Sequence, residues 1–373
     1  MEYNIKCSNC HRPSHNLLDY KCPSCGQPLN IELTKKFNPD LIKKNNYSAW
    51  RYADTFPYVK QADIITLGEG WTPLVKFKNN THFKLENLNP TGSFKDRGST
   101  TLISAIHELV KNKNGTIAED SSGNAGASIA AYAARSNLKA QIYVPENVSG
   151  PKLVQTQFFG AKIIKVSGTR NQVAQTAQKP SKNKYYIGHI LHPIFRDGIR
   201  TLAYEITEQY EWQTPQNIFI PVSAGTLLLG ILSGFEHLVL SNVIKKAPRI
   251  IACQTEQVSP LYHRIKNSPY KPPVHVDSIA DALVSTDPPL LNIMTDQLQN
   301  AQGDAIIVKE NEILLAFKEL ARKGFFVEPS SAVAFAAYKK QIGDKLIQQE
   351  AKTVVVLTGA GLKTPDTVTQ HFP

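Results

Sequence analysis

Short apolar runs alternate with amphipathic stretches along most of this chain. Buried strands are predicted at 116–120, 139–145, 161–167, 217–223, 249–255 and 353–358. Residues with a helical period lie between them, at about 99–110, 125–136, 152–159, 170–178, 196–210, 225–240, 310–323 and 330–341. Strands that alternate with helices of about 10 to 15 residues are typical of βαβ units, so we predict an α/β fold with parallel sheet.

The two remaining parts of the chain have a different composition. A polar connector rich in Lys and Asn covers roughly Asn30 to Lys60, and we expect loops with a short helix at about Ser259 to Gly303, where Pro, Asp and Ser are frequent. Hydrophobic residues make up 42% of the 373 residues, enough for a sizeable core. Because no apolar run reaches 18 residues and no signal-like segment opens the chain, we expect a cytoplasmic protein with no membrane span.

Four of the five cysteines lie close together in two CxxC pairs near the N-terminus. They are Cys7, Cys10, Cys22 and Cys25. Such pairs bring four thiolates together around zinc, and a closed four-thiolate shell has no open position for water. We therefore predict a small structural zinc ribbon over residues 1–30, in preference to a disulfide framework.

A lysine lies at the predicted start of the helix that covers 99–110. The segment NPTGSFKDRG, residues 89–98, changes from turn residues to helix-forming residues, and Lys95 stands at the change. The positive end of a helix and burial both lower the pKa of an ammonium group. Lys95 is therefore a candidate Schiff-base lysine.

Three predicted strand-to-helix junctions contain small and polar residues. Ligands of open α/β sheets gather at such carboxyl ends. Asn124, in the first junction, offers an amide to a ring oxygen, and Thr358, in the third, offers a hydroxyl to a ring nitrogen. The second junction suits a phosphate held by backbone N–H groups and comprises Val222, Ser223, Ala224, Gly225 and Thr226. Together with an amine at Lys95, this inventory matches pyridoxal 5′-phosphate.

The chain resembles the fold-type II pyridoxal-phosphate enzymes of the tryptophan synthase β-like family, and within them the threonine synthases. The resemblance spans about residues 64 to 366. It rests on LGEGWTPL, LENLNPTGSFKDRG, SSGNAGASIAAYAAR, VPENVSGPKLVQ, PVSAGTLLLG, EPSSAVAFAAY and LTGAGLK. It implies two three-layer α/β/α subdomains within residues 31–373, the smaller at about 97–195 inserted into the larger.

The resemblance also implies the roles of individual residues. Lys95 matches the lysine that binds the cofactor, Asn124 the contact to its 3′-oxygen, and Thr358 the contact to its pyridine nitrogen, while residues 222–226 match the phosphate cradle. The implied reaction converts O-phospho-L-homoserine and water to L-threonine and phosphate. Candidate contacts to this small anionic amino acid are Ser121, Ser122, His189 and Arg196.

Two departures from the threonine synthase pattern leave other substrates open. Threonine synthases often have a hydroxyl where Ala125 stands, and an asparagine-rich stretch where this chain has GHILHP at 188–193. The alternatives are a threonine or serine dehydratase and a cysteate or cysteine synthase that uses O-phosphoserine.

A zinc-ribbon protein that binds nucleic acid or a partner, with a degenerate enzyme body, is a third alternative. The net charge of +11 favours it slightly, but we see no aromatic-interleaved basic stripe. The family implies a homodimer.

Overall fold

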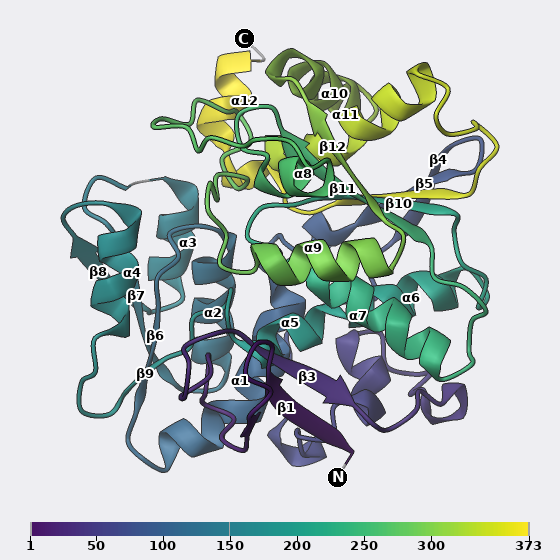
Figure 1. Ribbon diagram of the computed structural model, residues 1–373. Helices are drawn as coiled ribbons and strands as arrows, with labels where there is room; N and C mark the ends of the chain where they lie inside the picture. Colours follow the sequence, from purple (N-terminus) through teal and green to yellow (C-terminus); the bar gives the residue numbers. More distant parts are fainter. Residues whose placement is uncertain (1, 149, 372–373) are drawn as a thin grey trace. The chain divides into compact units, whose positions relative to one another are not determined.

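The computed structural model describes residues 2–148 and 150–371 and confirms a mixed α/β fold (Figure 1). The chain divides into two compact units. Unit 1 comprises Met1–Gly70 and Asn89–Ile199, and unit 2 comprises Trp71–Leu88 and Arg200–Pro373. The N-terminal cysteine segment is part of unit 1. No described helix is both long and apolar enough to span a bilayer.

Unit 1 is built on a parallel sheet with strand order β8-β7-β6-β9 (Figure 1). Its strands are β6 (Thr116–Glu119), β7 (Lys139–Pro145), β8 (Lys162–Val166) and β9 (Lys184–Tyr186). Its helices are α1 (Lys95–Lys111), α2 (Asn124–Arg135), α3 (Pro151–Phe158), α4 (Arg170–Gln178) and α5 (Pro193–Ile199). Helix α1 packs against both α2 and α5.

The N-terminal segment of unit 1 forms a small antiparallel sheet with strand order β2-β1-β3. Its strands are β1 (Tyr3–Cys7), β2 (Pro13–Ser14) and β3 (Leu29–Leu33). Figure 1 shows β1 and β3 beside each other. The small core consists of Ile5, Cys7, Cys22 and Leu29, so two of the cysteines also contribute to packing. We call residues 2–33 the ribbon.

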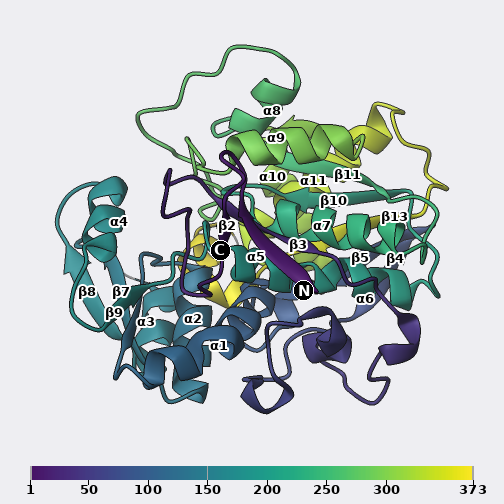
Figure 2. The same ribbon diagram turned by 60° about the horizontal axis from the view of Figure 1, so that its bottom comes forward.

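Unit 2 contains a sheet with strand order β12-β11-β10-β13-β5-β4, in which only the β4–β5 pair of these described strands is antiparallel. The strands are β4 (Leu74–Lys78), β5 (Thr81–Leu85), β10 (Asn217–Pro221), β11 (Arg249–Thr255), β12 (Asp304–Val308) and β13 (Thr353–Leu357). The helices are α6 (Thr201–Gln209), α7 (Thr226–Leu240), α8 (Pro260–Ile265), α9 (Leu291–Asn300), α10 (Glu310–Arg322), α11 (Pro329–Gly343) and α12 (Pro365–His371). Helix α11 packs on β10, β11, β12 and β13 (Figure 2).

The predicted strands are all present as β6, β7, β8, β10, β11 and β13. The helix predicted at 196–210 is interrupted, because α5 ends at Ile199 and α6 begins at Thr201. The segment at 259–303, expected to be loops and one short helix, contains both α8 and α9. The prediction did not include β4, β5, β9, β12 and α12.

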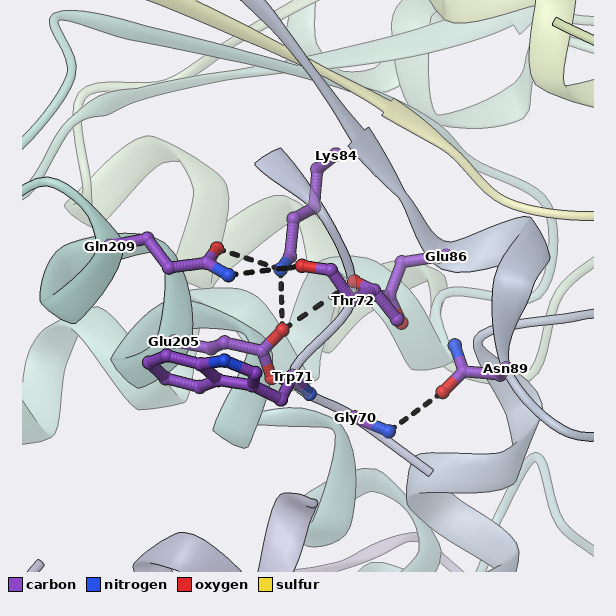
Figure 3. A network of polar contacts seen from close by, with 8 residues as sticks. All are labelled: Gly70, Trp71, Thr72, Lys84, Glu86, Asn89, Glu205 and Gln209. Atoms are coloured by element: carbon purple, nitrogen blue, oxygen red, sulfur yellow. Dashed lines mark hydrogen bonds and ion pairs between the residues drawn. The ribbon is translucent and has the colours of Figure 1, made fainter. Parts of the chain in front are cut away.

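A buried ion pair supports the edge of the unit 2 sheet (Figure 3). The ammonium of Lys84 in β5 contacts the carboxylate of Glu205 in α6, and both side chains are fully buried. Lys84 also donates to the carbonyl of Thr72 at 2.5 Å and to Oε1 of Gln209 at 2.9 Å. Glu205 accepts from the N–H of Trp71 at 2.8 Å. The pair therefore fixes the chain where it enters β4.

Candidate functional site

Lys95 is the first residue of α1, as the sequence predicts. Its ammonium nitrogen lies 4.9 Å from the centre of the Phe94 ring and 5.9 Å from that of Phe195 in α5. Gly98 allows this approach, because a Cβ there would lie 2.6 Å from the Phe195 ring. Lys95 is thus half-buried, with its amine beside two aromatic rings. Aromatic rings stabilise a cation less than water does, unless an anion is also near.

Asp96 anchors the loop that leads to Lys95. Its buried carboxylate accepts from the N–H of Thr91 at 2.7 Å and from the hydroxyl of Thr91 at 2.6 Å. Ser128 of α2 donates to the same carboxylate at 2.6 Å, and its oxygen lies 2.7 Å from the hydroxyl oxygen of Ser99. Burial raises the pKa of Asp96 to about 6, although these hydrogen bonds work the other way. The contacts tie the first turns of α1 and α2 together.

Asn124 is the first residue of α2. The hydrogen bonds of Asp96 and Ser128 that join α1 to α2 therefore also hold Asn124 in the part of unit 1 that carries Lys95. The preceding turn contains Ser121, whose hydroxyl accepts from the N–H of Gly123 at 3.3 Å, and the half-buried Ser122. A Cβ at Gly126 would lie 1.9 Å from the carbonyl oxygen of Ser121. Only glycine therefore fits where α2 closes against this turn.

His189 lies in a buried pair with Glu119, the last residue of β6. Its Nδ1 is 2.6 Å from Oε1 of Glu119, and its main-chain N–H donates to Oε2 at 3.0 Å. Burial raises the pKa of Glu119, but His189 and, to a smaller extent, Lys95 lower it overall. Lys95 and His189 thus both lower the pKa of one buried carboxylate.

Arg196 lies in α5 and is 5% exposed. Its guanidinium donates to the main-chain carbonyl of Leu29 in the ribbon and to Oδ1 of Asn30 at 3.3 Å. Burial lowers its pKa to about 10, partly offset by Asp197. The contacts give Arg196 a role in holding the ribbon, and its predicted contact with the substrate phosphate stays a prediction.

In unit 2 the predicted phosphate cradle and Thr358 follow adjacent parallel strands. The cradle comes after β10 and Thr358 after β13, and these strands pair in parallel, so both features lie at the same edge of the sheet. Gly225 has a φ of +99° and forms the N-cap of the buried helix α7. A Cβ at Gly225 would lie 2.3 Å from Sδ of Met294. The cradle thus presents the positive end of a helix with little side-chain bulk, as a phosphate requires.

The hydroxyl of Thr358 is oriented by Ser331 of α11. Oγ of Ser331 accepts from the N–H groups of Thr358 and Gly359, at 2.9 and 3.0 Å, and lies 3.1 Å from Oγ1 of Thr358. Two accepted bonds use both lone pairs of the Ser331 oxygen, so it cannot also accept from Thr358, and its own proton is shared between Oγ1 of Thr358 and the carbonyl oxygen of Gly359 at 3.3 Å. The proton of the Thr358 hydroxyl is then available for an acceptor such as a ring nitrogen.

The four ribbon cysteines converge. All four sulfurs lie within 4.8 Å of one another, and three of the separations are 3.4 Å (Cys7 to Cys25), 3.6 Å (Cys10 to Cys25) and 3.7 Å (Cys10 to Cys22). Sulfurs at the corners of a tetrahedral zinc site, about 2.3 Å from the metal, are about 3.8 Å apart. The cysteines are free thiols, and the cluster is therefore compatible with a metal ion.

Sequence reasoning missed two functional candidates. Glu119 was not identified as the partner of His189. Ser331 lies in the quoted motif EPSSAVAFAAY, but its relation to Thr358 was not foreseen. A carboxylate at the end of an apolar strand was the one available signal for Glu119, since burial of a charge requires a partner.

Comparisons with known proteins agree with this arrangement. The family profile of pyridoxal-phosphate dependent enzymes matches residues 65–359. The threonine synthase of Methanocaldococcus jannaschii is 33% identical, over 93% of this chain and 89% of that protein. The threonine synthase of Methanosarcina acetivorans is 29% identical, over 98% and 93%.

Solved structures share the fold. The processed form of threonine deaminase isoform 2 from Solanum lycopersicum aligns with a TM-score of 0.70 and 19% identity, over 90% of this chain and 94% of that one. The family match covers both the helix start at Lys95 and the cradle before α7. The chain therefore belongs to the family of pyridoxal-phosphate dependent enzymes.

Proposed function

We propose that this protein is a threonine synthase, which converts O-phospho-L-homoserine and water to L-threonine and phosphate. Similarity to threonine synthases along almost the whole chain is the observation that carries the proposal. The substrate is a small anionic amino acid, and the net charge of +11 suits its capture.

The residues described above fit pyridoxal 5′-phosphate. Lys95 would bind the cofactor covalently, and Asn124 would contact its 3′-oxygen. In unit 2, Val222, Ser223, Ala224, Gly225 and Thr226 would hold its phosphate, and the available proton of Thr358 would be donated to its pyridine nitrogen. When bound, the cofactor supplies an electron sink that makes the α- and β-protons of an amino acid removable. Lys95 would act as the base that takes these protons.

Four residues of unit 1 are proposed to contact the substrate. Ser121 and Ser122 precede α2 and offer hydroxyls to an anion. His189 and Arg196 add donors on the segment before and within α5. Ala125 and the stretch GHILHP at 188–193 replace groups with which threonine synthases often bind the phosphate, so we expect the chain to use these donors instead.

We further propose that the four cysteines hold a structural Zn²⁺. Four thiolates complete a tetrahedral shell, and zinc binding stabilises such small segments. The subdomain boundaries, a ribbon at 1–30 and an inserted subdomain at about 97–195, stay predictions, as do a homodimer and a cytoplasmic location.

The test is to incubate the purified protein with O-phospho-L-homoserine, L-threonine and O-phospho-L-serine separately, and to measure phosphate, threonine and keto acid. Release of phosphate and threonine from the first substrate alone is the expected result. Keto acid from threonine would show a dehydratase, and turnover of phosphoserine only with sulfite or sulfide would show a cysteate or cysteine synthase.

The lysine assignment has its own test. Borohydride reduction followed by peptide mapping should locate the cofactor on Lys95. Lys95→Ala should bind the cofactor without the visible absorbance of a lysine adduct. An adduct on another lysine would refute the assignment.

A further inference from the structure

A buried carboxylate–imidazole pair shares the neighbouring ring of Phe195 with the candidate lysine, and the reaction as proposed above does not use its carboxylate. Glu119 at the end of β6 is fully buried, and the His189 side chain is 8% exposed. Both oxygens of Glu119 contact His189, one through the main-chain N–H and one through Nδ1. Such a two-point contact fixes both the backbone and the ring of His189.

His189 and Lys95 have an aromatic neighbour in common. The ring of His189 packs edge-on against Phe195, with 5.4 Å between ring centres. The ammonium of Lys95 lies 5.9 Å from the centre of the same Phe195 ring. Phe195 is fully buried, so one aromatic ring is shared by the histidine and the lysine within unit 1.

The contact with Glu119 decides which ring nitrogen of His189 can react. A carboxylate next to Nδ1 keeps a proton on that nitrogen, because the alternative would place two acceptors 2.6 Å apart. The other nitrogen, Nε2, is then the one that can give or take a proton. The remaining exposure of the ring is consistent with access from the site, whereas Glu119 is sealed off.

Resting on the proposed function, we propose that Glu119 is a positioning residue for His189, and that Nε2 of His189 transfers protons to and from the substrate. In this cycle His189 starts with a proton on each ring nitrogen. As the bond between Cγ and the ester oxygen breaks, its electron pair goes to the oxygen, and the proton on Nε2 passes to the leaving phosphate, while Nδ1 keeps its proton. When water adds at Cβ, Nε2 takes the proton that the water loses. The histidine thus returns to its starting state, and the protons balance.

The first measurement does not depend on turnover. Ring ¹⁵N resonances of the cofactor-free protein report which nitrogens of a histidine carry protons, and His189→Asn identifies the signal of His189. We expect a protonated Nδ1 in the wild type and a shifted signal in Glu119→Gln, where one acceptor oxygen becomes a donor. Asp120→Asn is the matched control, because the neighbouring Asp120 accepts a hydrogen bond from Tyr186 at 2.6 Å, a contact that does not involve the ring of His189. An unchanged signal in Glu119→Gln would overturn the positioning role.

The second measurement is the kinetics of phosphate release from O-phospho-L-homoserine. We expect His189→Asn to lower kcat by about 100-fold or more with a smaller change in KM, as for loss of a general acid–base group. If Glu119 acts through His189, the double variant should be no slower than His189→Asn alone. Additive losses, or a kcat that His189→Asn leaves unchanged, would overturn the proposal.

The two measurements separate this inference from the proposed function. If the wild-type protein binds the cofactor on Lys95 but releases no phosphate, the proposed function is refuted. The proposed proton transfer by His189 is then refuted as well. Phosphate release with an unchanged kcat in His189→Asn leaves the proposed function intact and refutes only the role of His189.

Discussion

The guanidinium of Arg196 in α5 donates a hydrogen bond to the main-chain carbonyl of Leu29 in β3 of the ribbon. Arg196 is buried, so this contact compensates part of the cost of removing its charge from water, while Nη1 is buried without a hydrogen-bond partner among the described residues. The same helix carries Phe195, whose ring lies beside Lys95. The folded state of the ribbon therefore affects α5, the helix whose Phe195 ring lies beside the candidate lysine.

We therefore predict that removing the Zn²⁺ proposed for the ribbon loosens α5 as well as the ribbon. Chelation should unfold residues 2–33, and Arg196 would then lose its acceptor while still buried. Hydrogen exchange followed by mass spectrometry should show faster exchange in Pro193–Ile199 after chelation. Helix α10 of unit 2 is the internal control. Faster exchange confined to the ribbon would contradict the prediction.

His192 makes the stability of the protein depend on pH. Its side chain is fully buried, and burial, with a further contribution from Arg196, lowers its pKa from 6.5 to about 3. Below its ordinary pKa the unfolded chain binds a proton that the folded chain does not, so stability is lost as the pH falls from 6.5 towards 3. At one unit below the ordinary pKa the loss is about 1.4 kcal/mol.

The variant His192→Asn cannot gain this proton. Its urea midpoint should therefore fall less than that of the wild type when the pH is lowered to about one unit below the ordinary histidine pKa. Parallel changes in the two proteins would show that His192 is not responsible.

The sequence pattern predicts elements whose signal is local. Apolar runs such as 353–358 and the change to a helical period at Lys95 need no knowledge of distant residues. Strand β5 was missed because THFKL contains Lys84, whose partner Glu205 comes 121 residues later. A buried charge resembles an exposed one until its partner is known.

In the candidate site, too, residues with a local sequence signal were predicted and residues that depend on a distant partner were not. Lys95, Asn124 and Thr358 were predicted because each stands at a junction that is visible in the sequence. Glu119 was not assigned a role because its partner His189 lies 70 residues away, and Ser331 was missed although Thr358 is only 27 residues away. Their roles depend on which strand ends and loops the fold brings together.

The ion pair between Lys84 and Glu205 predicts a large effect of a single substitution. In Lys84→Met the carboxylate of Glu205 stays buried and loses its cation, which should cost about 3–5 kcal/mol in the free energy of unfolding. The double variant Lys84→Met/Glu205→Leu should be destabilised by less than the sum of its single variants. Denaturant unfolding measures both.

An exposed pair on α10 and α11 provides the control. Lys339 and Glu319 form an ion pair with side chains 44% and 35% exposed, so Lys339→Met should cost less than about 1 kcal/mol. Equal costs for Lys84→Met and Lys339→Met would refute the importance of burial here.

Gly225 predicts a selective loss of cofactor binding. Alanine at this position would have to adopt a φ of +99° and would place its Cβ 2.3 Å from Sδ of Met294. The left-handed backbone alone costs about 1–2 kcal/mol, and the contact forces the cradle or Met294 to move. We expect Gly225→Ala to weaken pyridoxal 5′-phosphate binding by about 10-fold or more, equivalent to about 1.4 kcal/mol, in an absorbance titration.

The variant Gly324→Ala is a control that distinguishes the effect of backbone strain from the effect of displacing the cradle. It also has a positive φ, +85°, but a Cβ there would meet no atom of the described residues within 4 Å. Gly324→Ala should therefore lower stability slightly and leave cofactor affinity unchanged. If Met294 is the obstacle, Gly225→Ala/Met294→Ala should recover part of the lost affinity, because the shorter side chain leaves room for the new Cβ. Equal affinities in Gly225→Ala and Gly324→Ala would show that the cradle tolerates the added atom.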